Sequence, residues 1–321
     1  MIGKAILPIL LLPALPCMAG SLQFSQPLDC TLGETCFIQN FVDRDPGPGW
    51  RDHLCGALSY DGHQGTDFAL PTVADMAAGV TVRAAAPGRV LRTRDGEEDG
   101  AMAAGADVSA AECGNAVVIA HEDGWQSVYC HLREGSVRVQ PGAIVLNGAP
   151  LAEVGMSGAA AFPHLHFALY HNGQLVDPFQ PDLTESCTLD PTDTLFEPEL
   201  TAAATGLIAA GFATTPPDYA AIQTELPRLD TTTATAPALI AWGYGWGIQA
   251  GDILRVRIDG PGGFTFTHDT PFDAPKVRFY RLAGKKMPPG GWPPGPYRAT
   301  LEVLRAGSPV ATRETRIEIT D

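Results

Sequence analysis

Short runs of alternating apolar and polar residues, separated by turns rich in glycine and proline, recur along most of the chain. In the first half, the runs at residues 116–120 and 126–130 flank the turn Glu122-Asp123-Gly124, a pattern typical of a β-hairpin. Further runs lie at residues 80–84, 88–92, 137–139, 143–145 and 165–170. Helical periodicity is weak, so we predict β-structure with a flexible insertion at residues 95–111.

The second half alternates in the same way. Strand-like runs lie at residues 253–258, 276–280, 297–303 and 313–320. Their spacing predicts a small β-sandwich of the immunoglobulin type. Three aromatic residues, Trp242, Tyr244 and Trp246, alternate along another possible strand. They could stack on sugars of a cell wall, but packing in the core of the sandwich is the simpler interpretation.

The composition agrees with an all-β protein. The 321 residues include 35 glycines and 28 prolines, which suits many turns and short strands. Hydrophobic residues make up 45% of the chain, enough to build buried cores. The formal net charge of −15 argues against a general polyanion-binding surface, so no nucleic acid partner is expected.

The first 19 residues have the pattern of a secretory signal peptide. A lysine at position 4 precedes an apolar run, and Cys17-Met18-Ala19 offers small residues for cleavage. The apolar run is shorter than the ~20 residues that a membrane span needs. A lipid anchor on Cys17 is a rival interpretation, although Pro16 is a poor residue before a lipidated cysteine. We therefore expect a periplasmic or secreted protein without a stable membrane span after cleavage.

Cysteine and histidine usage divides the remaining chain. All six other cysteines and seven of the eight histidines precede residue 195. Residues 200–321 contain no cysteine and a single histidine, His268. The Pro- and Thr-rich stretch 188–198 is the predicted boundary between domains at residues 20–195 and 200–321. An even number of cysteines in an exported protein predicts three disulfides. We favour the pair Cys113–Cys130, which would lock the strand that presents His131.

Three histidine clusters carry the candidate chemistry. They are His63-Gln64-Gly65-Thr66-Asp67, then His131 after Tyr129-Cys130, and finally His164-Leu165-His166. Gly65 should let the chain turn so that His63 and Asp67 converge, and residues two apart on a strand share one face. Imidazoles with one carboxylate are the ligands of a catalytic zinc site. Spacing alone does not say which of His164 and His166 binds the metal, and the sequence contains neither an HExxH nor a GxSxG motif.

Taken together and in order, these motifs resemble the lysostaphin/LytM-type zinc endopeptidases of bacterial peptidoglycan, also called duplicated hybrid motif peptidases. The resemblance covers about residues 55–180. It rests on Gly62–Asp67, Ala85–Val90, Gly114-Asn115, Val128–Leu132, Val139–Gly142, Gly155–Gly158, Pro163–Phe167 and Asp177-Pro178. It implies a LytM-like β-sheet or half-barrel metallopeptidase domain, followed here by an unrelated accessory sandwich.

The resemblance also implies the roles of the site residues. His63, Asp67 and His166 would be the ligands of one zinc ion per chain, and His131 and His164 would orient or deprotonate the attacking water. The expected activity is hydrolysis of peptide cross-links or stem peptides of peptidoglycan. One alternative is a non-hydrolytic module that binds the wall or activates an amidase. Another is a protease whose substrate is a secreted glycine-rich protein. The accessory domain could contact the wall or a protein partner.

Overall fold

The computed structural model describes residues 22–181 and 194–321. The predicted signal peptide, Cys187 and much of the predicted boundary lie outside these described residues. In the described residues the regular secondary structure is almost entirely β, with 7% helix, which confirms the all-β prediction. Among the described residues, no helix is both long and apolar enough to cross a membrane.

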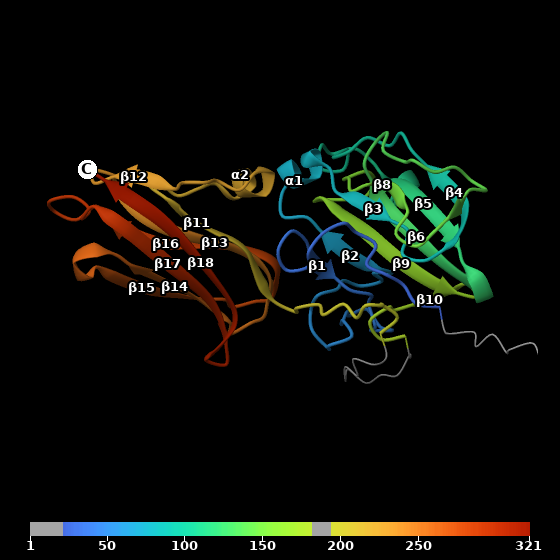
Figure 1. Ribbon diagram of the computed structural model, residues 1–321. Coiled ribbons are helices and arrows are strands. Elements are labelled where there is room, and N and C mark those ends of the chain that lie inside the picture. The colour runs from blue at the N-terminus through green and yellow to red at the C-terminus, as the bar shows by residue number, and fades with distance from the viewer. Residues whose placement is uncertain (1–21, 182–193) are drawn as a thin grey trace, which may run out of the picture.

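The first region is built around one antiparallel sheet of eight strands (Figure 1). Its strands follow the order β1-β2-β9-β6-β5-β4-β7, with β10 paired to β9, and β3 and β8 form a separate pair. The elements are β1 (Phe37–Asn40), β2 (Thr66–Ala69), α1 (Val73–Ala78), β3 (Thr81–Arg83), β4 (Gly88–Arg94), β5 (Asn115–Ala120), β6 (Trp125–Leu132), β7 (Ile144–Val145), β8 (Pro150–Glu153), β9 (His164–His171) and β10 (Gln174–Val176).

The second region contains two further sheets, of three and five strands. The three-stranded sheet has the order β11-β13-β16, and the five-stranded sheet has the order β12-β18-β17-β14-β15. The elements are β11 (Gly206–Ala213), α2 (Tyr219–Thr224), β12 (Thr231–Thr233), β13 (Ala238–Ile248), β14 (Ile253–Asp259), β15 (Thr265–Pro271), β16 (Lys276–Lys286), β17 (Gly295–Arg305) and β18 (Ser308–Thr320). The two sheets share one hydrophobic core, and the immunoglobulin type of this region stays a prediction.

Strand β13 explains how the three-stranded sheet is buried on both faces. Its aromatic residues Trp242, Tyr244 and Trp246 belong to the core of the first region. The alternating glycines face the other way, and a Cβ atom on Gly243 would lie 2.7 Å from a methyl carbon of Leu301 on the five-stranded sheet. The three aromatic side chains are at most 4% exposed, so they pack in a core and are not available for stacking on sugars.

The two regions are therefore in close contact. The ring of Phe37 on β1 stacks on Trp246 of β13 with centroids 4.9 Å apart. The short helices α1 and α2 also meet at this junction (Figure 1). A hydrophobic core that continues from one region into the other is expected to hold them in a fixed relation.

One predicted strand is absent, and one predicted disulfide is present. Residues 137–139 are not a strand, whereas Ile144–Val145 forms β7 and pairs with β4. The predicted disulfide Cys113–Cys130 is present, and a second joins Cys30 to Cys36. Cys55 is also disulfide-bonded.

Candidate metal and catalytic site

Successive side chains of strand β9 point alternately into the hydrophobic core and towards the candidate site. The β9 residues that are completely buried in the core are Leu165, Phe167 and Leu169. His164 and His166 point to the opposite face, as residues two apart on a strand must. On the neighbouring strand β2, Asp67 pairs directly with His166 in the antiparallel register. The sheet thus brings one carboxylate and two imidazoles together on the same surface.

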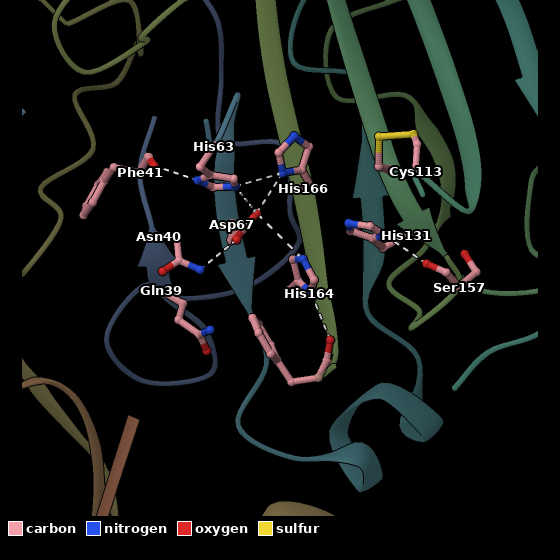
Figure 2. Close-up of polar contacts among 12 residues, drawn as sticks. Gln39, Asn40, Phe41, His63, Asp67, Cys113, His131, Ser157, His164 and His166 are labelled. Carbon is pink, nitrogen blue, oxygen red and sulfur yellow. Dashed lines mark hydrogen bonds and ion pairs between the residues drawn. A yellow bond between two sulfur atoms is a disulfide. The ribbon is translucent and has the colours of Figure 1, made fainter. Parts of the chain in front are cut away.

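His63 completes a compact group with Asp67 and His166 (Figure 2). The Nε2 atom of His63 lies 3.1 Å from Asp67 Oδ1 and 3.1 Å from His166 Nδ1. His166 Nδ1 lies 2.9 Å from the same carboxylate oxygen. These three side chains are the ones expected to hold the metal, and their donor atoms lie within 4.8 Å of one another.

Surrounding hydrogen bonds orient two members of this group. His63 Nδ1 donates to the carbonyl oxygen of Phe41 at 2.7 Å, so the neutral ring carries its lone pair on Nε2, facing Asp67. Asn40 donates from Nδ2 to the other carboxylate oxygen, Asp67 Oδ2, at 2.9 Å. Such outer contacts are typical of metal ligands, because they fix the tautomer and the angle of each ligand.

The electrostatics of the group fit a bound cation. Burial alone would raise the pKa of Asp67, but the neighbouring His63 and His164 hold it well below its usual value. Burial would lower the pKa of His63, yet the Asp67 carboxylate raises it above its usual value. A neutral His63 and an ionised Asp67 would point lone pairs at each other, so the pair needs a proton or a metal ion between them. Two imidazoles and a carboxylate are the donor set that zinc prefers.

His131 reaches the site through an irregularity in strand β6. The register of β5 with β6 shifts between the pairs Asn115–Leu132 and Val117–Tyr129, so Cys130 and His131 together oppose one residue of β5. His131 also has a positive φ of 60°. Simple alternation would turn His131 towards the core with Tyr129, and the bulge redirects it to the face of Cys130. The disulfide Cys113–Cys130 fixes the chain at this point.

His131 and His164 lie side by side, with ring centroids 4.6 Å apart. Each uses Nδ1 to donate to a backbone carbonyl oxygen, at Ser157 and Phe162 respectively, both at 2.9 Å. Each neutral ring therefore keeps a lone pair on Nε2. Burial lowers the pKa of both rings, which favours the neutral form that can accept a proton. His164 Nε2 lies 3.7 Å from Asp67 Oδ1, somewhat farther than the His166 donor.

An open groove of about 500 Å³ lies over the site and is lined by His63, His131 and His166. Residues from several loops and strands line it, among them Tyr60, Gln64, Glu112, His131 and Tyr170. The predicted insertion at residues 95–111 lies against loops that follow β6 and β8. Its Asp99 carboxylate accepts hydrogen bonds from the backbone N–H groups of Met156 at 2.6 Å and Glu134 at 3.1 Å. The insertion is thus tied to the rim of the site.

The structure gives Gly65 a different role from the predicted turn. Gly65 does not have a positive φ. A Cβ atom at this position would instead lie 2.6 Å from the His166 ring and 2.8 Å from the Phe167 carbonyl oxygen. A glycine is required because the backbone passes directly against a predicted metal ligand.

The structure brings together all five predicted site residues, and it places the other histidines elsewhere. His53 packs between the rings of Phe41 and Phe179, whereas His171 stacks on Trp125 outside the group. Sequence reasoning missed residues that support the site from neighbouring segments. These are Asn40, Tyr60, Phe162 and Arg278. No spacing or motif in the sequence marks them, because their partners are distant along the chain.

Known proteins that resemble this chain match the same segment. Residues 61–178 match the model of Peptidase family M23. The DD-carboxypeptidase/endopeptidase Mpg of Neisseria meningitidis is 34% identical over 129 residues, which cover 39% of this chain and 25% of the relative. The peptidoglycan DD-endopeptidase ShyB of Vibrio cholerae is 30% identical over 121 residues, covering 38% and 23%. The chain thus spans about a quarter of the length of these relatives.

Solved structures of M23 proteins also resemble part of this chain, with low TM-scores. The catalytic domain of the prophage-encoded M23 protein EnpA from Enterococcus faecalis is 25% identical, covers 46% of this chain and 92% of that one, and has a TM-score of 0.32. At that TM-score the structural likeness supports no conclusion. The assignment rests on the family model and the curated relatives, which identify residues 61–178 as an M23 peptidase domain of the lysostaphin/LytM type.

Proposed function

We propose that this protein is an exported zinc-dependent endopeptidase that hydrolyses peptide cross-links or stem peptides of peptidoglycan. The observation that carries the proposal is the cluster of five side chains at one groove, which His63, His131 and His166 line directly. Three of the five would form the ligand group, and the two neutral rings of His131 and His164 present Nε2 lone pairs beside it. The two matched relatives are named as a DD-carboxypeptidase/endopeptidase and a peptidoglycan DD-endopeptidase, which supports this class of substrate.

His63, Asp67 and His166 would hold the zinc ion. When bound, the ion would polarise the scissile carbonyl and lower the pKa of water at the site. Either His131 or His164 can take a proton from the attacking water at Nε2, because each Nδ1 is already committed to a backbone carbonyl oxygen. While that ring holds the proton, its Nε2–H can donate a hydrogen bond to the oxyanion, and it then transfers the proton to the leaving amine.

The open groove suits an extended peptide. Its walls carry the exposed Tyr60 and the partly exposed Tyr170, which offer apolar area with a polar tip. We further propose that residues 20–195 form the peptidase domain and that residues 200–321 form an accessory β-sandwich. Periplasmic or secreted localisation would follow from the substrate and from the pattern of the first 19 residues.

The direct test combines metal analysis with release of dye from labelled peptidoglycan. The wild type should bind one zinc per chain and release dye, whereas His131→Ala should bind zinc and release none. A wild type that binds sacculi without releasing dye, with binding unchanged in His131→Ala, would instead identify a non-hydrolytic binding or activating module. Cleavage of a glycine-rich protein but not of sacculi would move the substrate to that class.

A further inference from the structure

Arg278 of strand β16 reaches from the second region to Phe162 and Gln39 of the first, next to the candidate site. It pairs in register with Trp246, and its guanidinium carbon lies 4.1 Å from the ring centroid of Phe162. Its Nε donates a hydrogen bond to Oε1 of Gln39, and its Nη1 donates to the hydroxyl of Tyr244 at 3.1 Å. Arg278 is thus a bridge between a strand of the second region and two segments of the first.

Both of those segments lead directly to the candidate catalytic group. The ring of Phe162 stacks on the imidazole of His164, with centroids 4.4 Å apart and an interplanar angle of 29°. The carbonyl oxygen of Phe162 also accepts the His164 Nδ1–H bond. On the other side, Gln39 is the extra residue of a bulge in β1, and it precedes the Asn40 that orients Asp67.

The setting of Arg278 is unusual for a purely structural arginine. Among the described residues, no carboxylate forms an ion pair with it. Arg278 is partly buried, and its Nη2 atom is buried without a hydrogen-bond partner. A cation in such a place is costly for stability without a carboxylate partner, so its contacts must be made by oxygens and aromatic faces. The Phe162 ring is suited to this, because its quadrupole attracts the cation. The same ring also stacks on the His164 imidazole.

We propose that Arg278 is a positioning residue for the peptidase reaction, holding the His164 ring in place through Phe162. This inference rests on the proposed function. It makes the second region part of the catalytic apparatus, because the strand that anchors Arg278 belongs to that region. Arginine is needed since its planar group can lie on the Phe162 ring and donate to Gln39 at once, which a lysine ammonium cannot do in the same geometry.

The test compares Arg278→Met and Arg278→Lys with Arg281→Met in the full-length, zinc-loaded protein. Arg281 lies on the same strand, but its guanidinium packs on Phe272 of the second region. Arg278→Met should lower kcat for a soluble cross-linked muropeptide by roughly 10- to 100-fold, the range for outer-sphere partners, with KM and zinc content unchanged. The kcat of Arg278→Lys should lie between those of Arg278→Met and the wild type, and Arg281→Met should keep wild-type kcat. In a further variant, Arg278→Ala, added guanidinium should restore part of the lost kcat.

A double-mutant cycle tests the proposed path. Phe162→Leu should lower kcat to a similar extent, and combining it with Arg278→Met should add little, because both variants break the same link. Additive losses would overturn the path through Phe162. An unchanged kcat in Arg278→Met, a rise in KM alone, or an equal loss in Arg281→Met would overturn the positioning role.

A readout without turnover separates this inference from the proposed function. The His164 imidazole signal in nitrogen-15 spectra, assigned with His164→Gln, should shift or broaden in Arg278→Met and stay unchanged in Arg281→Met. If the wild type cleaves no peptidoglycan, the proposed function fails, but this spectrum still decides whether Arg278 holds the ring. An unshifted signal would overturn the inference whatever the activity.

Discussion

The two regions of this protein use the same strand geometry for different purposes. In the first region, β2 and β9 bury one face and carry the chemistry on the other, so that Phe68 and Asp67 are neighbours with opposite roles. In the second region, β13 buries both faces and carries no titratable cluster. One region thus carries the proposed reactive groups, while the other supplies part of the hydrophobic core that packs beside them.

Removing a predicted ligand is the strongest way to sharpen this contrast. Asp67→Ala should abolish stoichiometric zinc binding and lower peptidoglycan hydrolysis by more than about 1,000-fold, because the ion and its polarising effect are lost. Zinc content and dye release measure the two effects. His171→Ala on the neighbouring strand β9 is the control and should retain both, and a zinc-replete, active Asp67→Ala would contradict the ligand assignment.

The shared core can be broken at Trp246, which packs against Phe37 of the first region. Trp246→Ala should lower the free energy of unfolding by about 3–5 kcal/mol and split one calorimetric transition into two. Trp292 is equally buried but belongs to the core of the second region alone. Trp292→Ala should therefore destabilise the protein without weakening the link between the regions. Two transitions already present in the wild type would show that the regions unfold independently.

The disulfides Cys30–Cys36 and Cys113–Cys130 allow a comparison inside the first region. Replacing Cys113 and Cys130 by serine opens a loop of 17 residues and should cost about 3 kcal/mol in the loop-entropy estimate. Replacing Cys30 and Cys36 opens a loop of only 6 residues and should cost about 2 kcal/mol. Denaturant unfolding measures both. Activity per folded molecule should fall only in the first variant, since Cys130 adjoins His131, and equal activity in the two would contradict this role.

The last predicted effect concerns pH and His53. Burial against Phe41 and Phe179 lowers the pKa of His53 to about 4, from 6.5 in the unfolded chain. The unfolded state therefore binds a proton in this range while the folded state does not, so stability falls as the pH drops from 6.5 towards 4. At pH 4.5 the loss from this residue should be about 2–3 kcal/mol.

The matched variant His53→Phe isolates that contribution. Its unfolding free energy should depend less steeply on acid than that of the wild type, as measured by denaturant unfolding at pH 7 and pH 4.5. Asp177, near the same cluster, acts in the opposite sense, because burial raises its pKa to about 6 and its protonation favours the folded state. Asp177 is present in both proteins, so the difference between them reports on His53. Parallel pH profiles would contradict the assignment.

Much of the first region could be predicted from the sequence because its signals are local. The hairpin around residues 122–124 became β5 and β6, and the pair His164 and His166 shares a face by alternation alone. Alternation could not place His131, since a bulge in β6 sets its direction. The buried face of β13 and the contact of Arg278 with Phe162 join residues far apart in the chain, so no local pattern reveals them.

The central claim is that the five-residue group hydrolyses peptide bonds of peptidoglycan. Mass spectrometry of muropeptides tests it most directly, after purified peptidoglycan is incubated with the zinc-loaded protein or with His131→Ala. The account predicts that cross-linked dimers become monomers only with the wild type, and the product masses will then identify the bond. Intact dimers after incubation with a wild type that has bound zinc would contradict the claim.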